Sequence, residues 1–292
     1  MSEKIRFESH AFGESAGRFS VLIPTWNNLP MLRLCIEAVR KHSRHRHQIV
    51  VHVNEGVDGT AKWLAEQKID HTFTPDNAGI CHALNAARTL ARSPWLLYLN
   101  DDMYTLPGWD QALIEEAEKI GHRRFYLSST MIEPEMSNNP CVIAPHDYGR
   151  DVDSFREEAL LDEGPTLPFG DWSGATWPPS LVHADLWDEV GGLSPEFSPG
   201  IGSDPDFSMK LYQTGVRLFK GVAASRVYHF QSRSTGRVVK NDGRKQFFKK
   251  WGMSISTFTR QVLRRGKPFS GPLPEGPIRV PLKDRLRRIV YF

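Results

Sequence analysis

Short apolar segments alternate with helix-like segments through the first third of the chain, and this alternation constrains the fold more than any other feature. Strands are predicted at residues 19–23, 48–53, 69–74 and 95–99, and helices at about 30–41, in a segment ending at 67, and at 77–92. Pro24 is expected to end the first strand, and Asn27 or Asn28 to cap the helix after it. Strands separated by helices of this length form right-handed crossovers. We therefore predict an α/β fold with a mostly parallel central sheet flanked by helices.

An acidic segment follows the fourth predicted strand. The apolar run Trp95–Leu99 leads directly into Asn100, Asp101 and Asp102. Ligands of open α/β sheets bind at the carboxyl ends of the strands, and Mg²⁺ or Mn²⁺ prefers carboxylate and phosphate oxygens. The segment therefore suits a metal-bound diphosphate. The alternative is that these residues only end the strand and start a turn, as Asn and Asp commonly do.

Turn-rich segments at 24–28, 54–60 and 100–102 are expected to meet at one edge of the sheet and to form a nucleotide-sized crevice. A dinucleotide-binding turn needs Gly-x-Gly-x-x-Gly after the first strand, but the segment 24–28 contains no glycine. The sequence also lacks a phosphate-binding P-loop. We therefore predict that Mn²⁺ or Mg²⁺ offsets the phosphate charge.

Composition excludes several classes of protein. The 292 residues are enough for a large core, and no apolar stretch approaches the ~20 residues of a bilayer-spanning helix. Residues 1–12 lack the apolar middle of a secretory signal, so we expect a cytoplasmic protein. The further expectation that it is peripheral at the inner face of the membrane rests on the basic C-terminal end described below. Three widely spaced cysteines favour neither a disulfide framework nor a zinc site. The histidines of segment 42–47 are interpreted as part of an exposed basic loop, because no acidic residue lies near them in the sequence.

Positive charge is concentrated at the C-terminal end. Residues 231–292 contain 16 Lys and Arg against 3 Asp and Glu, whereas residues 1–230 contain 21 against 31. Phe247, Phe248, Trp251 and Phe258 are interspersed with these cations, which predicts a basic, helical, amphipathic extension lying on a surface. We expect it to associate with an anionic membrane and expect no nucleic acid partner. The alternative is a solvated basic helix.

Several motifs, spread over residues 19–231, resemble glycosyltransferase family 2, which has the GT-A fold. Residues 21–27, Val-Leu-Ile-Pro-Thr-Trp-Asn, resemble the opening strand and turn of that family, and residues 53–60 resemble its second-strand loop. Residues 77–85 resemble its Asn-x-Gly helix start, and residues 100–102 its Asp-x-Asp motif with Asn in the first place. The resemblance implies a nucleotide-binding half at about 19–103 and an acceptor half at about 104–230, within a GT-A domain of residues 1–230.

The resemblance also implies the site residues. Residues 203–207, Ser-Asp-Pro-Asp-Phe, resemble a segment in which the first Asp is the catalytic base, which makes Asp204 the base here. Metal ligation falls to Asp102 and His229. The implied nucleotide-sugar contacts are Pro24, Thr25, Asn27, Asn54, Asp58, Asn77, Gly79, Asn85, Asn100, Asp101, Gly174 and Ala175.

Local sequence allows other roles for two of these residues. Asp204 before Pro205 also has the pattern of a helix N-cap, and the two roles are compatible. His229 lies between aromatic residues, where a half-buried histidine with satisfied hydrogen bonds is the alternative to a metal ligand.

The resulting prediction is a metal-dependent, inverting glycosyltransferase that moves a sugar from a nucleotide diphosphate donor to a hydroxyl of a glycan or lipid-linked saccharide. The expected donor is a UDP-sugar. The resemblance implies the hexosyl or N-acetylhexosaminyl type. Two alternatives stay open. One is a nucleotidyltransferase, although such enzymes normally carry a glycine-rich loop after their first strand, and segment 24–28 has no glycine. The other is a nucleotide- or glycan-binding module without catalytic activity.

Overall fold

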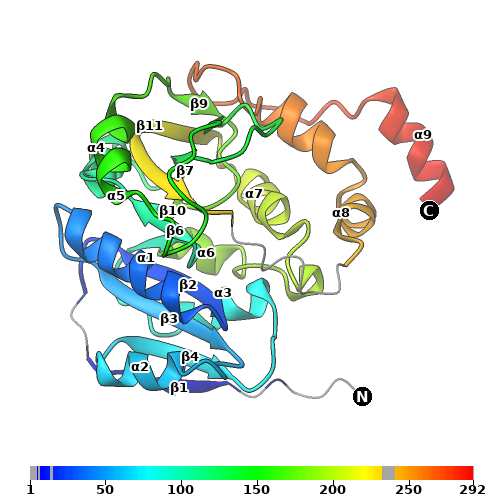
Figure 1. Cartoon of the computed structure of the whole chain (residues 1–292). Coiled ribbons are helices and arrows are strands. Elements are labelled where there is room, and N and C mark those ends of the chain that lie inside the picture. Colours follow the sequence, from blue (N-terminus) through cyan, green and yellow to red (C-terminus); the bar gives the residue numbers. More distant parts are fainter. Residues whose placement is uncertain (1–4, 6, 14–15, 232–240, 292) are drawn as a thin grey trace.

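The computed structural model describes residues 5, 7–13, 16–231 and 241–291, and the strands of this part form one 11-stranded sheet (Figure 1). The strands are β1 (Glu8–His10), β2 (Ser20–Trp26), β3 (Gln48–Asn54), β4 (Asp70–Thr74), β5 (Trp95–Tyr98), β6 (Met103–Thr105), β7 (Phe125–Ile132), β8 (Val142–Ile143), β9 (Trp172–Ser173), β10 (Ser180–His183) and β11 (Leu218–His229). The α-helices are α1 (Leu29–His42), α2 (Thr60–Glu66), α3 (Ile80–Arg88), α4 (Trp109–Ile120), α5 (Glu157–Glu163), α6 (Ala184–Glu189), α7 (Ser203–Gln213), α8 (Gly243–Trp251) and α9 (Leu282–Tyr291). Three shorter helical turns are η1 (Gly164–Thr166), η2 (Pro195–Phe197) and the π-helical η4 (Thr257–Val262).

The first half of the sheet confirms the predicted α/β pattern. Strands β4, β3, β2 and β5 lie side by side and run parallel. The expectation that Pro24 ends the first strand is wrong, because β2 continues to Trp26 and Pro24 lies opposite His52 of β3. Helix α3 also ends at Arg88, before the predicted Arg92.

Antiparallel strands extend the sheet beyond β5. Strand β10 lies between β5 and β7 and is antiparallel to both, and β11 runs parallel to β7. Strand β6 pairs antiparallel with the end of β11, so that His229 lies opposite Met103. This pairing brings the end of the chain's longest strand next to the acidic segment after β5.

The sheet has an apolar core on each face. Val21 and Ile23 of β2 pack into the core that includes α1, α2 and α4, whereas Leu22 between them packs into the core that includes α3, α6 and α7. Alternate residues of a strand point to opposite faces, so both faces of this strand are covered by helices. Such burial stabilises the fold by about 25 cal/mol per Å² of apolar surface.

The C-terminal segment is packed more deeply than its composition suggested. Phe247, Phe248 and Phe258, which were expected to lie on a surface, are buried, and Phe247 and Phe258 belong to the core around α7. Residues 232–240 of the predicted basic extension lie outside the described residues. No helix among the described residues is long and apolar enough to span a bilayer.

The prediction that segment 42–47 is an exposed basic loop is also wrong in part. His42 and His47 are buried, and His47 Nε2 lies 3.0 Å from a carboxylate oxygen of Asp110. Asp110 also accepts hydrogen bonds from the backbone amides of Arg44 and His45. The acidic partner that the local sequence lacked comes from α4.

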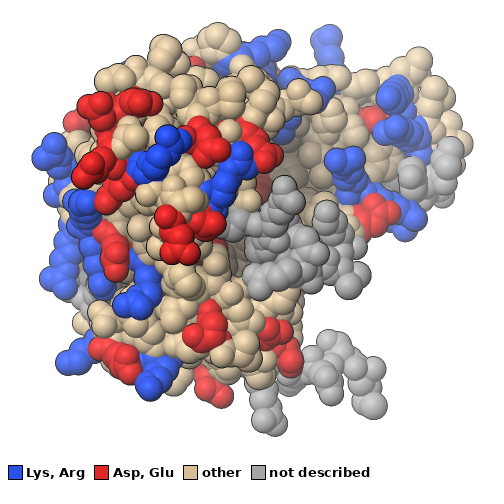
Figure 2. Space-filling view, viewed as in Figure 1, with Lys and Arg blue, Asp and Glu red and all other residues tan. Residues whose placement is uncertain are grey.

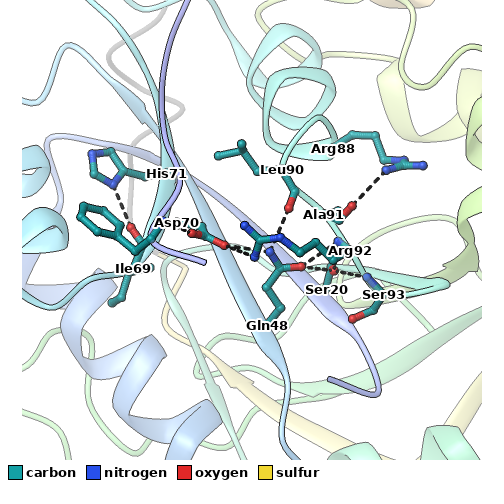
Figure 3. Close-up of polar contacts among 11 residues, drawn as sticks. Ser20, Gln48, Ile69, Asp70, His71, Arg88, Leu90, Ala91, Arg92 and Ser93 are labelled. Carbon is teal, nitrogen blue, oxygen red and sulfur yellow. Dashed lines mark hydrogen bonds and ion pairs between the residues drawn. The ribbon is translucent and has the colours of Figure 1, made fainter. Parts of the chain in front are cut away.

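A polar network ties together the starts of the parallel strands, at the edge opposite the acidic segment (Figure 3). Asp70, which is fully buried, accepts hydrogen bonds from the side chains of Gln48 at 2.9 Å and Arg92 at 2.7 Å, and from the amide of Phe12. The Gln48 side chain also accepts from the amide of Arg92 and from the hydroxyl of Ser20. The network fixes the loop that leads into β5.

We expect Asp70→Asn to lower the free energy of unfolding by about 2 kcal/mol, because an amide group cannot accept from all three donors and leaves buried partners unsatisfied. Urea unfolding measures the loss. Asp188→Asn, which removes the exposed ion pair with Arg88, is the matched control and should cost less than about 1 kcal/mol. Equal losses in the two variants would contradict a special role for Asp70.

Candidate active site

A pocket of about 370 Å³ opens where the carboxyl ends of β5, β7 and β11 meet the start of α7. Asn100, Asp204 and His229 line it together with apolar side chains such as Met131 and Trp177. Three candidate site residues that lie far apart in the sequence therefore line one cavity. It lies at the sheet edge where ligands of α/β proteins bind.

Asp102 and His229 form a carboxylate–imidazole pair beside this pocket. Asp102 is 6% exposed, and its Oδ2 lies 3.5 Å from His229 Nε2. On the other side of the ring, His229 Nδ1 lies 3.0 Å from Glu133 Oε1. A carboxylate that holds one ring nitrogen fixes the orientation of the other, an arrangement common behind metal-binding histidines.

The two carboxylates govern the charge of His229. Burial lowers the pKa of the imidazole, but the attraction of and hydrogen bonds to Asp102 and Glu133 outweigh burial and raise it to about 10. At neutral pH the ring therefore carries a proton on each nitrogen and balances part of the acidic charge. A metal ion bound through Nε2 has to replace one of these protons, so its binding strengthens as the pH rises.

The donor set of this pair fits Mn²⁺ or Mg²⁺ only in part. A carboxylate and an imidazole suit Mn²⁺, but no group of three or more His, Cys, Asp or Glu side chains within the described ranges could hold a metal by itself. Ions of this type commonly take one or two protein ligands and complete their coordination with substrate phosphates and water. Asp102 and His229 therefore suit a metal ion that arrives with a diphosphate.

Glu133 is a residue of this site that the sequence reasoning missed. It directly follows the buried strand β7, just as the acidic segment 100–102 follows β5. The signal used for Asp102, a carboxylate after an apolar strand, was therefore also present at residue 133.

Asp204 lies in the first turn of α7 and points a half-buried carboxylate into the pocket. Its predicted role as helix N-cap is wrong, because the helix begins at Ser203 and Gly202 occupies the cap position. Within the described residues the carboxylate makes no hydrogen bond or ion pair. Burial alone raises the pKa of Asp204 to about 7, which poises it to accept a proton near neutral pH.

The loops after β2 and β3 are bound to each other. The amide oxygen of Asn27 accepts from the backbone of Val57 at 3.0 Å, and Asp58 accepts from the backbone of Leu29, the first residue of α1, at 2.8 Å. Thr25 donates to Asp101 at 2.7 Å, which joins these loops to the acidic segment. Pro24 lies within β2, so this part of the predicted nucleotide site is a rigid, interconnected rim.

The segment before α3 is fixed in the same way. Asn54 is buried and accepts from the amide of Ala78 at 2.9 Å, and Asn77 accepts from the amide of Gly79. Gly79 has a φ of +79°, and a Cβ there would lie 2.8 Å from the Cα of Pro199. Glycine therefore lets the segment before α7 approach the start of α3 and close one wall of the pocket.

Among the predicted nucleotide-sugar contacts only Asn100 lines this pocket. Three of the others, Asn85, Gly174 and Ala175, are held by packing contacts. The side chain of Asn85 is taken up by both backbone groups of Leu193, at 2.9 and 2.7 Å. Ala175 is fully buried, and a Cβ at Gly174 would lie 2.6 Å from the backbone of Arg265. In this structure these residues pack the fold rather than face the cavity.

Residues 20–156 match the model of the family described as Glycosyl transferase family 2. Over this part, which is just under half of its length, the chain is similar to that family. The match includes Asp102 and Glu133, whereas Asp204 and His229 lie beyond it. No curated protein sequence matches the chain.

Solved glycosyltransferase structures share the fold. A structure of GalNAc-T7 with UDP, GalNAc and Mn²⁺ superposes with a TM-score of 0.57 at 17% identity, covering 85% of this chain and 50% of that one. A structure of S. aureus TarS gives a TM-score of 0.55 at 16% identity, covering 82% and 40%. Residues 1–349 of TarS with UDP-GlcNAc give 0.51 at 15% identity, covering 74% and 61%. The chain thus spans about two fifths to three fifths of these proteins and has the GT-A fold.

Proposed function

We propose that the chain is an inverting glycosyltransferase that transfers a sugar from a nucleotide diphosphate donor to a hydroxyl acceptor, with Asp204 as the catalytic base. The single observation that carries the proposal is the shared pocket, which is lined both by Asp204, a carboxylate with a pKa of about 7, and by His229, whose ring pairs with Asp102. One group can accept a proton, and the other pair suits the metal-bound diphosphate. These are the two functions that displacement at a sugar carbon requires.

Each residue has a defined part in this reaction. Asp204 accepts the proton of the acceptor hydroxyl as the hydroxyl attacks the sugar carbon. Asp102 and His229 would hold Mn²⁺ or Mg²⁺, and the ion when bound supplies positive charge for the leaving diphosphate. Glu133 keeps the His229 ring in place, and Asn100 lies on the side of the ribose. A single base and direct displacement invert the anomeric centre without a covalent intermediate.

The donor is proposed to be a UDP-sugar of the hexosyl or N-acetylhexosaminyl type. The support is that TarS and GalNAc-T7, which have the same fold, are described with UDP or UDP-GlcNAc, and GalNAc-T7 also with Mn²⁺. We propose that the contacts are made by the rim segments around Thr25, Asn27, Asp58 and Asn77. The acceptor is proposed to be a glycan or a lipid-linked saccharide, and a cytoplasmic location stays a prediction.

A thermal-shift screen of UDP, GDP and dTDP with Mn²⁺ tests donor binding, because a ligand that binds only the folded form raises the melting temperature. We expect UDP with Mn²⁺ to give the largest shift. In Asp102→Asn the Mn²⁺-dependent part should vanish, and release of nucleoside diphosphate from the donor should fall by about 10²-fold or more. The control is Asp162→Asn, an exposed carboxylate of α5, which should behave as wild type.

Two outcomes would contradict the proposal. Release of pyrophosphate instead of nucleoside diphosphate would indicate nucleotidyl transfer. Donor binding with no turnover by the wild-type protein across a panel of glycan and lipid-linked acceptors would favour a silent binding module.

A further inference from the structure

A basic groove lies between α8, η4 and α9. All of its lining residues are C-terminal to those that line the pocket of Asp204. Its volume is about 810 Å³. Its charged lining consists of six cations and two carboxylates: Arg244, Lys245, Arg260, Arg265, Lys283, Arg287, Asp242 and Asp284. Figure 2 shows Lys and Arg side chains on the C-terminal arm at the right of the view, where Figure 1 places α9.

Both carboxylates of the groove are already used by the protein. Asp242 caps α8 by accepting from the amide of Lys245. Asp284 accepts from the amide of Ser254 at 3.0 Å and from the hydroxyl of Thr257 at 2.6 Å. By contrast, among the described residues Arg244 and Lys283 form no ion pair with an acidic side chain. The groove is therefore left with excess positive charge that an anionic partner would balance.

Helix α9 adds an apolar stripe beside this groove. Leu282, Leu286 and Ile289 are 70%, 55% and 78% exposed. Their spacing of four and three residues places them on one face of the helix, because successive residues are turned by about 100°. Asp284, the residue by which α9 is bound to the turn before η4, lies on the opposite face. The stripe therefore faces away from the protein, and the groove cations Lys283 and Arg287 lie on the side of α9 between the stripe and Asp284.

We propose that the groove and the stripe of α9 together form a docking surface for an anionic lipid bilayer. Lipid phosphates would enter the groove and meet its cations, and Leu282, Leu286 and Ile289 would enter the boundary of the acyl chains. An exposed apolar stripe flanked by Lys and Arg is the pattern of helices that lie in a membrane interface. A nucleic acid or a soluble polyanion would use the cations but would leave the apolar stripe in water. The combination of the two features therefore selects the bilayer.

Co-sedimentation of the full chain with vesicles tests this surface without any donor or acceptor, so its outcome is independent of the proposed glycosyl transfer. The vesicles are an equimolar mixture of phosphatidylglycerol and phosphatidylcholine, compared with phosphatidylcholine alone. We expect the bound fraction to be at least about tenfold higher on the anionic vesicles and to fall with added salt.

Two pairs of substitutions separate the parts of the surface. Leu286→Glu with Ile289→Glu, on the stripe, should reduce partitioning to anionic vesicles by about tenfold or more. Arg244→Gln with Arg260→Gln, on α8 and η4, should reduce it while leaving the docking of α9 through Asp284 intact. Val152→Glu places a charge on another exposed apolar residue and is the matched control, with no loss expected. Melting temperatures verify that each variant is folded.

Three results would overturn the proposal. The first is equal binding to neutral and anionic vesicles, and the second is no binding to either. The third is salt-sensitive binding that the two stripe substitutions leave unchanged, which would indicate a site for a soluble polyanion.

Discussion

Asp204→Asn is expected to remove glycosyl transfer while making the protein more stable. Loss of a positioned general base lowers kcat by about 10²–10⁴-fold, and donor binding should be retained because the Asp102–His229 pair is untouched. The stability gain follows from the pKa of about 7. An unfolded Asp has a pKa of about 3.9, so between about pH 4 and pH 7 the folded state binds more protons and its stability falls as the pH rises. Asparagine removes this cost, and we expect a gain of about 1–3 kcal/mol at pH 8.

The pH dependence gives a second measurement of the same group. Asp204 accepts a proton only when it is ionised, so kcat of the wild-type enzyme should rise with pH and reach a plateau above about pH 7. Initial rates of nucleoside diphosphate release and urea unfolding at about pH 5, 6.5 and 8 measure the change in kcat and the change in stability. These values lie below, near and above the pKa of Asp204. Asp162→Asn should change neither. A variant Asp204→Asn that retains kcat within about twofold would end the assignment of the base.

The parallel half of the fold could be predicted from the sequence because its signals are local. Buried strands such as Trp95–Tyr98 are short apolar runs, and the helix between β2 and β3 has an apolar face. Boundaries were less accurate where tertiary contacts decide them. Pro24 stays in β2, and helix α3 stops before Arg92 because that residue is bound to Asp70.

The site was only partly predictable for a related reason. The carboxylates after β5 could be recognised locally, but the contact of Asp102 with His229 depends on β6 pairing with the end of β11. No local pattern reports such a pairing, and only the order of family motifs suggested it. The roles of Asn85 and His47 depend on partners in distant segments, Leu193 and Asp110, which the sequence alone does not place.

Asp206→Asn, two residues from Asp204 on the same helix, is expected to change stability in the opposite direction. Asp206 is fully buried and accepts hydrogen bonds from the indole of Trp251 at 2.7 Å and the hydroxyl of Ser194 at 2.6 Å. Its carboxylate also lies 3.0 Å from the ammonium group of Lys250. Asp206 also lies in the first turn of α7, where a carboxylate complements the helix dipole. In the structure it holds α8, and with it the C-terminal segment, against α7.

Asp206→Asn removes a buried charge and leaves Lys250 with Glu196 as its remaining carboxylate partner, at 2.8 Å. The amide also cannot accept from all the donors that surround Asp206, so we expect the free energy of unfolding to fall by about 2–3 kcal/mol. The double variant Asp206→Asn with Lys250→Met removes both charges and should recover part of this loss, which a double-mutant cycle measures as a coupling energy. Urea unfolding of Asp204→Asn and Asp206→Asn side by side makes the comparison direct, because the substitution and the helix are the same. Two stability changes of the same sign would contradict the distinction between an unpaired base facing the pocket and a paired carboxylate that holds the fold together.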